Sequence, residues 1–172
     1  MVMTGSKSFA NIAFGENIIR VMENSSIEIT KAVLDKTAGT ENTELSIKEG
    51  KLFSRVGRKL VKGDLYLVKT PTTVASVRGT NFLVASYQGK SSVSCLNGKI
   101  EVQKNDDPKA EPVEVKEGEG IAIEIGKEIE IKKLSDDEIA MLLDIVESIE
   151  GDDTVKAAPL SNRPFPDYDI KH

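Results

Sequence analysis

The sequence predicts an all-β protein: an antiparallel sandwich or a solenoid-like β-domain, followed by one C-terminal amphipathic helix and an extended tail. Apolar and polar residues alternate through most of the chain, which is typical of strands with one buried and one wet face. Turn residues separate these strands about every 8–12 residues. Only near the C-terminus does the spacing of apolar residues become that of a helix. We therefore place the β-domain at residues 4–134, the helix at 135–151 and the tail, which contains three prolines, at 152–172.

The first third of the chain contains short strands between turns. Turns are predicted at Gly15–Asn17 and Asn24–Ser26, and the polar stretch Asp35–Asn42 is predicted to be a loop. Glu49-Gly50-Lys51 has the composition of a turn. We therefore expect two separate strands on either side of it, at Glu44–Ile47 and Leu52–Val56.

The rest of the β-domain alternates more regularly. Asn97-Gly98 is a strong hairpin signal, so Ser91–Leu96 is predicted to pair with the following strand, in which Ile100 and Val102 share a face. Cys95 lies on the same face as Val93 and is expected to be a small buried hydrophobe. Further strands are predicted at Leu65–Lys69, Thr72–Val77, Asn81–Tyr87, Val113–Val115, Ile121–Ile125 and Ile129–Ile131.

The helix is predicted from its own signals. Ser135 and Glu138 form a capping box, and Gly151 ends the helix. An apolar stripe follows the helical period and consists of Ile139, Leu142, Leu143, Val146 and Ile149. We prefer the interpretation that this stripe packs on the β-domain. The alternative is a docking helix for a partner or a second copy, through Ile139, Leu142, Leu143 and Val146.

Enzymatic chemistry has little support in the sequence. The only histidine is His172, which excludes a Ser-His-Asp triad, a Cys-His pair and a multi-histidine metal site within one chain. A pair of carboxylates could still hydrolyse a glycoside. However, the chain has no Trp, and residues such as Glu128 and Glu130 alternate with isoleucine as on a solvated sheet face. We expect no catalysis, no metal and no cofactor.

Charge is unevenly distributed along the chain. The whole sequence carries a net charge of −5, whereas residues 48–69 contain 7 basic and 2 acidic residues. This segment suggests a basic patch that meets an anionic partner, formed by Arg55, Arg58, Lys59 and Lys62. Nucleic acid would need a stronger positive field and more aromatic residues, so we do not expect it as a partner.

Arg78-Gly79-Thr80 interrupts a β-branched stretch with a long cation and a glycine. The glycine suggests a bulge or sharp bend. We expect Arg78, between Val77 and Phe82, to be half-buried and to hold backbone carbonyls or pair with Asp64. This interpretation makes the stretch structural rather than a ligand site.

Several ordered segments resemble the FecR domain family. They are L-S-I-K-E-G-K-L-F from Leu45, L-V-K-T-P-T-T-V-A-S-V-R-G-T-N-F-L-V from Leu67, V-S-C-L-N-G-K-I-E-V from Val93 and V-K-E-G-E-G-I-A-I from Val115. The resemblance covers about residues 4–131. It implies that residue 4 corresponds to a point after the family's first strand, and we therefore expect that this strand and an export segment are not included in the sequence. Its motif residues are Thr70, Pro71, Val77, Arg78, Gly79, Thr80 and Phe82.

The resemblance implies a non-catalytic sensory or interaction domain in the periplasm or associated with the outer envelope, as a stand-alone exported or lipid-anchored protein. Its partner would be a protein or a cell-wall component, and a homodimer through the helix or an edge strand is a further option. In the iron-uptake regulators that name the family, such a domain senses an outer-membrane receptor and relays to an anti-sigma segment. An anti-sigma-type transmembrane regulator is therefore the alternative, and a carbohydrate-active enzyme with paired carboxylates is the second alternative.

Overall fold

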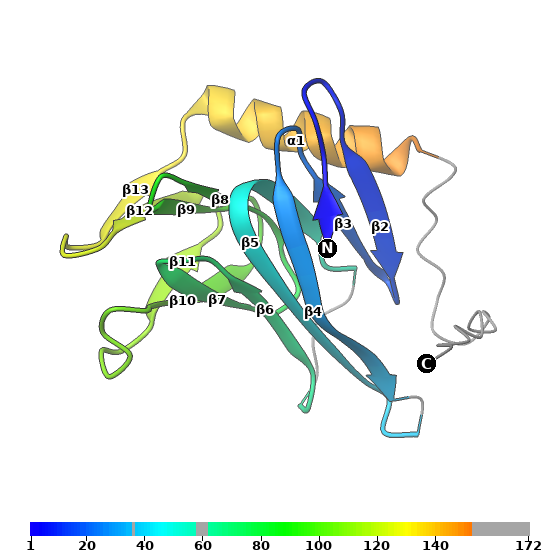
Figure 1. Ribbon diagram of the computed structural model, residues 1–172, viewed down its shortest axis with the longest axis horizontal. Coiled ribbons are helices and arrows are strands. Elements are labelled where there is room, and N and C mark those ends of the chain that lie inside the picture. The colour runs from blue at the N-terminus through cyan, green and yellow to red at the C-terminus, as the bar shows by residue number, and fades with distance from the viewer. Residues whose placement is uncertain (36, 58–61, 153–172) are drawn as a thin grey trace.

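Strand β5 (Thr40–Arg55) belongs to two sheets and determines how they are joined. The structure, a computed structural model, describes residues 1–35, 37–57 and 62–152. In it, two mainly antiparallel sheets, A and B, face each other, and one helix lies across the outer face of sheet B (Figure 1). This arrangement confirms the all-β fold with one C-terminal helix.

Sheet A contains β1, β4, the first part of β5, and then β6, β7, β10 and β11. Their bounds are β1 (Val2–Met3), β4 (Ser26–Asp35), β6 (Leu65–Lys69), β7 (Thr73–Val77), β10 (Lys99–Lys104) and β11 (Val113–Lys116). The only parallel pair among the described strands is β5 with β6.

Sheet B contains β2, β3, the second part of β5, and then β8, β9, β12 and β13. Their bounds are β2 (Ala10–Phe14), β3 (Asn17–Val21), β8 (Asn81–Tyr87), β9 (Lys90–Cys95), β12 (Glu119–Glu124) and β13 (Glu130–Lys133).

Gly50 is where β5 passes from one sheet to the other. Residues before it pair with β4 and β6, and residues from Gly50 onward pair with β3 and β8. Its φ of +105° is rare for other residues, and a Cβ here would overlap Ser25. The prediction of two separate strands with a turn at Glu49-Gly50-Lys51 is therefore wrong, because the glycine bends one continuous strand. The predicted loop at Asp35–Asn42 is also too long, since strands occupy both of its ends.

From β6 onward the chain alternates between hairpins and arches. The pairs β6–β7, β8–β9, β10–β11 and β12–β13 are hairpins within one sheet. The connections β7–β8, β9–β10 and β11–β12 are arches that cross to the other sheet. The predicted hairpin at Asn97-Gly98 is therefore wrong: β9 pairs with β8 and β12, whereas β10 pairs with β7 and β11.

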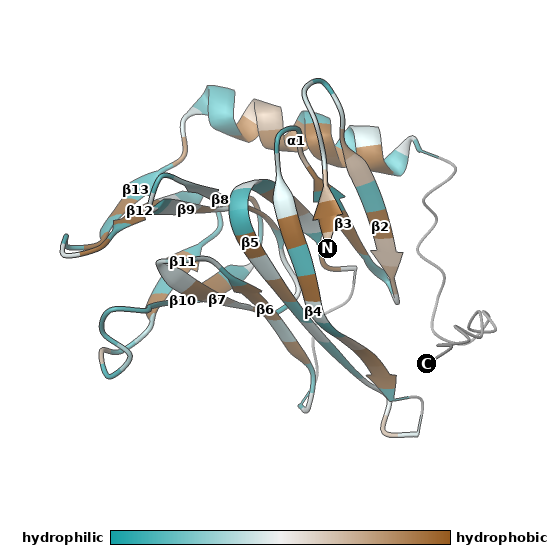
Figure 2. Cartoon of the chain, viewed as in Figure 1, coloured by the Kyte–Doolittle hydropathy of each residue, from teal (hydrophilic) through white to brown (hydrophobic). Residues whose placement is uncertain are grey.

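The core lies between the two sheets and is built from alternate residues of each strand. Figure 2 shows this alternation of hydrophobic and hydrophilic residues along the strands. At its centre the rings of Tyr66 and Phe82 meet edge to face, with their centroids 6.1 Å apart. Cys95 is fully buried in this core, as predicted, and its burial raises the pKa of the thiol to about 12.

Helix α1 (Asp136–Glu150) begins with the predicted capping box and covers part of the outer face of sheet B (Figure 1). Leu142, Ile145 and Ile149 are buried there against Ile18 and Phe53, which confirms that the helix packs on the β-domain. Within the predicted stripe, Leu143 is misplaced, because it is 47% exposed whereas Ile145 is buried. Most of the predicted tail, residues 153–172, lies outside the described residues.

Candidate functional site

The motif singled out by the sequence spans strand β7 from one end of the sandwich to the other. Thr70 and Pro71 lie in the β6–β7 hairpin, Val77 ends β7, and Arg78-Gly79-Thr80 forms the arch into β8, where Phe82 is buried. One sequence stretch therefore organises both ends of the molecule.

At the hairpin end, buried hydroxyl groups bond to one another. Oγ1 of Thr70 accepts hydrogen bonds from the backbone N–H of Thr73 (2.9 Å) and from Oγ of Ser91 (2.8 Å). Oγ1 of Thr72 donates to the same Ser91 oxygen at 2.7 Å. Thr70 and Thr72 belong to the β6–β7 hairpin of sheet A, whereas Ser91 belongs to β9 of sheet B. These hydrogen bonds therefore join the two sheets at the hairpin end of the sandwich.

At the arch end, backbone hydrogen bonds join each arch to the next one along the chain. The N–H of Leu96 donates to the carbonyl of Asn81 (2.9 Å), and the N–H of Gly118 donates to the carbonyl of Cys95 (2.9 Å). A Cβ added at Gly98 would lie 2.5 Å from Cγ2 of Thr80 and 3.0 Å from the carbonyl of Gly79. The arches at 78–80 and 96–98 are thus in close contact.

Arg78 does not have the predicted position. Its side chain is exposed rather than half-buried, because the arch directs it away from the core while Val77 and Thr80 point inward. Arg78 lines a polar hollow on the surface together with Lys62 and Asp64. The predicted cage of backbone carbonyls around a half-buried guanidinium is wrong.

The predicted basic patch is only partly described. Arg58 and Lys59 lie outside the described residues. Nη2 of Arg55 is 3.3 Å from a carboxylate oxygen of Glu150, so this cation ties β5 to the end of the helix. Lys62 lies in the hollow beside Arg78. The patch remains a prediction for binding an anionic partner.

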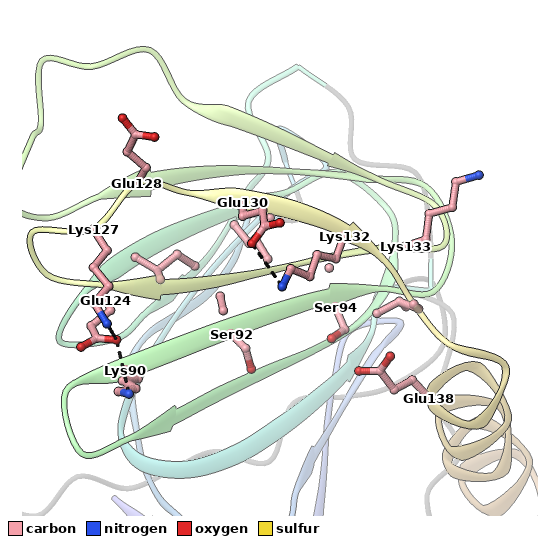
Figure 3. A pocket seen from close by; sticks show the side chains of 15 residues that line it. Lys90, Ser92, Ser94, Glu124, Lys127, Glu128, Glu130, Lys132, Lys133 and Glu138 are labelled. Carbon is pink, nitrogen blue, oxygen red and sulfur yellow. Dashed lines mark ion pairs between the residues drawn. The ribbon is translucent and has the colours of Figure 1, made fainter.

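The outer face of sheet B also contains a groove where the helix does not cover it (Figure 3). This groove, of about 380 Å³, runs over β9, β12 and β13 and ends at Leu134 and Glu138 at the start of α1. Its floor consists of small residues: Ser92 pairs with Ala122, and Ser94 pairs with Gly120. A larger residue at Gly120 would approach Leu134, since a Cβ there would lie 2.9 Å from its Cδ2. Sequence reasoning missed the groove, because small outward residues on neighbouring strands have no local signature.

Charged residues surround this groove, and Figure 3 shows their ion pairs. Glu124 lies 3.3 Å from Nζ of Lys90 and 2.9 Å from Nζ of Lys127. Hydrogen bonding to Lys127 lowers the pKa of Glu124, and the backbone N–H of Ser135 lowers that of Glu138. A general acid needs a raised pKa instead.

A polar clamp that the sequence did not predict holds the second half of the helix. Arg20 is only 4% exposed, although it carries a charge. Its Nε donates to Oδ1 of Asn11 (2.8 Å), its Nη1 donates to Oγ of Ser148 (2.9 Å), and its guanidinium stacks on Phe9. Burial lowers the pKa of Arg20, and the charge of Asp152 opposes this shift. Arg20 therefore joins β2, β3 and α1.

Two further features are absent from the described residues. No helix within 1–35, 37–57 and 62–152 is long and apolar enough to cross a bilayer. In the same residues, no group of three or more His, Cys, Asp or Glu side chains is arranged to hold a metal ion.

A sandwich of this kind, in which hairpins and arches alternate and one helix packs on the outer face of sheet B, defines an all-β domain. The chain belongs to the FecR protein family, whose family model matches residues 1–101. This match confirms the resemblance inferred from the sequence. No curated protein matches the chain.

Two solved structures share the fold. They are crystal structures, at 2.50 Å and 1.65 Å resolution, each of a "putative anti-sigma factor" from Parabacteroides distasonis. Both have a TM-score of 0.63 and 19% sequence identity to this chain. The first alignment covers 87% of this chain and 70% of the other, and the second covers 91% and 73%.

Proposed function

We propose that this chain is a non-catalytic interaction or sensory domain of the bacterial cell envelope, periplasmic or associated with the outer envelope, that binds a protein partner. Membership in the FecR family supports the class. The groove over β9, β12 and β13 is the observation that carries the binding proposal, because it is an open sheet face bordered by charges. Its small floor residues leave room for side chains of a partner.

The proposal is tested by photo-crosslinking in cells. A benzophenone amino acid replaces Ala122 on the groove floor, and in a matched variant it replaces Glu101 on the outer face of sheet A. We expect an adduct with an envelope protein from Ala122 and none with that protein from Glu101. Equal labelling from both positions, or no protein adduct from Ala122, would contradict the proposal. Fractionation of the same cells tests the location.

A second candidate function is the sensor part of an anti-sigma-type regulator. The observation that favours it is the fold shared with two crystal structures described as a "putative anti-sigma factor". This function requires that the complete gene product carries a membrane helix and a segment that binds a sigma factor. Purification of the complete product from detergent-solubilised membranes should then yield a sigma factor with it, and a product that lacks both segments would rule this function out.

The third possibility, hydrolysis of envelope carbohydrate by paired carboxylates, has weaker support. The lowered pKa values of Glu124 and Glu138 are opposite in direction to those of a general acid. Release of sugar from purified cell wall by the intact chain, lost in Glu124→Gln, would revive it.

A further inference from the structure

Strand β4 has an outer edge that the described residues leave largely uncovered. One side of β4 pairs with β5, and on the other side β1 pairs only with Ser26 and Ile27. The register with β5 shifts between Ile29 and Lys31, so Thr30 lies in a bulge that interrupts the edge. The turn at residues 37–39 lies beyond the C-terminal end of β4. Among the described residues, a regular edge without a neighbouring strand therefore runs from Lys31 to Asp35.

The composition of this edge is unusual. It reads Lys31-Ala32-Val33-Leu34-Asp35, with a cation at one end, an anion at the other and three apolar residues between them. Val33 is 47% exposed. Figure 2 shows this end of β4 in brown, and Figure 1 shows that the β4–β5 hairpin projects at the lower edge of the molecule. Edge strands are usually protected by charges along their length. By contrast, β13 carries Glu130, Lys132 and Lys133 within its four residues.

We propose that this edge binds a second copy of the chain, with two β4 strands antiparallel about a two-fold axis at Val33. In this register Lys31 of each copy faces Asp35 of the other, and Val33 faces Val33. If the two-fold axis passed through Ala32 instead, both ion pairs would be lost. If it passed between Lys31 and Ala32, the pairing would include the bulged residue Thr30 and would place Glu28 opposite Asp35, which are two like charges. The charges of the edge are therefore complementary to themselves in one register.

Both charged residues can make these pairs without loss of their own contacts. Oδ1 of Asp35 accepts hydrogen bonds from the N–H groups of Thr37 and Ala38, each at 2.9 Å. A carboxylate accepts on both oxygens, so Oδ2 can meet a lysine while the turn is kept. Lys31 lies opposite Glu44 in the register of β4 with β5, and the carboxylate of Glu44 already binds Nζ of Lys69 at 2.7 Å.

This association goes beyond the proposed function and does not obstruct it. Strand β4 belongs to sheet A, whereas the groove and the helix lie on the outer face of sheet B. Pairing through five residues makes a small contact, so the dimer is expected to be weak and to depend on concentration.

The test uses a disulfide across the two-fold axis. Antiparallel strands place directly opposed Cα atoms about 4.5–5.5 Å apart, within the range that a disulfide bridges. In Val33→Cys, oxidation of the purified chain should give a disulfide-linked dimer at least about ten-fold faster than in Ala38→Cys, whose thiols would lie far from the axis. The native thiol of Cys95 is fully buried and does not compete.

A second variant tests the register. Lys31→Glu added to Val33→Cys replaces two ion pairs with two repulsions and should slow the dimer's formation about ten-fold. Melting temperatures of all variants show that the fold is retained. Equal rates for Val33→Cys and Ala38→Cys would overturn the proposal, and so would a fast Val33→Cys reaction that is unchanged by Lys31→Glu.

Discussion

The side-chain Oδ1 of Asn97 accepts a hydrogen bond from the backbone N–H of Asn81 at 2.7 Å. The backbone carbonyl of Asn81 in turn accepts from the N–H of Leu96 at 2.9 Å. These two bonds join the arch that leads into β8 to the arch that leaves β9. The family motif and the Asn97-Gly98 turn therefore form one structural unit at the end of the sandwich.

We expect Gly98→Ala to destabilise the protein more than Gly126→Ala. Both glycines have φ of +77°, so the backbone cost of the substitution is matched. They differ in space: a Cβ at Gly98 meets Thr80 and Gly79, whereas a Cβ at Gly126 has nothing within 4 Å. The difference in free energy of unfolding should be about 1–3 kcal/mol, measured by urea denaturation. Equal losses would show that the two arches do not depend on this contact.

Arg78→Ala should change the free energy of unfolding by less than about 0.5 kcal/mol, because the side chain is exposed. Val77→Ala, at a position that is 1% exposed next to it, should cost about 1–3 kcal/mol. Both values come from thermal or urea unfolding. A large loss in Arg78→Ala would restore the structural role that the sequence suggested for its guanidinium.

Thr70→Val should cost about 1–3 kcal/mol of unfolding free energy. The shape is nearly unchanged, but the N–H of Thr73 and the hydroxyl of Ser91 lose their buried acceptor. Thr30→Val is the control, since its hydroxyl donates to Glu44 at an exposed position. Equal stabilities of the two variants in urea titrations would mean that the hydroxyl cluster does not stabilise the hairpin end.

Leu142→Ala and Leu143→Ala test which face of α1 is packed. Leu142 is fully buried, so its truncation should cost about 2–5 kcal/mol. Leu143 is 47% exposed, and its truncation should cost less than about 0.5 kcal/mol. Circular dichroism melting measures both. The opposite order would place Leu143, and not Leu142, against sheet B.

Stability should fall in acid because several carboxylates have lowered pKa values, among them Glu124, Glu114 and Asp106. A carboxylate with a lowered folded-state pKa stabilises the fold above its unfolded pKa, about 4. This stabilisation is lost as the pH falls through the folded-state pKa. The melting temperature should therefore decrease from about pH 5 to about pH 3, and less steeply in Glu124→Gln.

Salt provides the control for this pH effect. The ion pairs of Glu124 with Lys90 and Lys127 are exposed, so about 1 M NaCl should reduce the difference between Glu124→Gln and the native chain. If the two chains lose stability in parallel as the pH falls, in low and in high salt, Glu124 does not contribute to the pH dependence.

Local features of the fold could be predicted from the sequence because they depend on neighbouring residues. Alternation locates the strands, and β6 has the predicted bounds Leu65–Lys69. The capping box of Ser135 and Glu138 needs only residues within one helical turn, and it is present as predicted. The buried position of Cys95 follows from the period of two.

Strand pairing and the surface features could not be predicted, because they depend on residues far apart in the chain. A positive φ at Gly98 or Gly50 is needed equally by a hairpin, an arch or a bend, so it does not specify which strands become neighbours. The exposure of Arg78 depends on how its arch is directed, and the buried face of α1 depends on the shape of sheet B. The sequence by itself thus determined that strands and a helix form and which strand residues face inward. The tertiary structure alone decided which strands pair and which surfaces remain open.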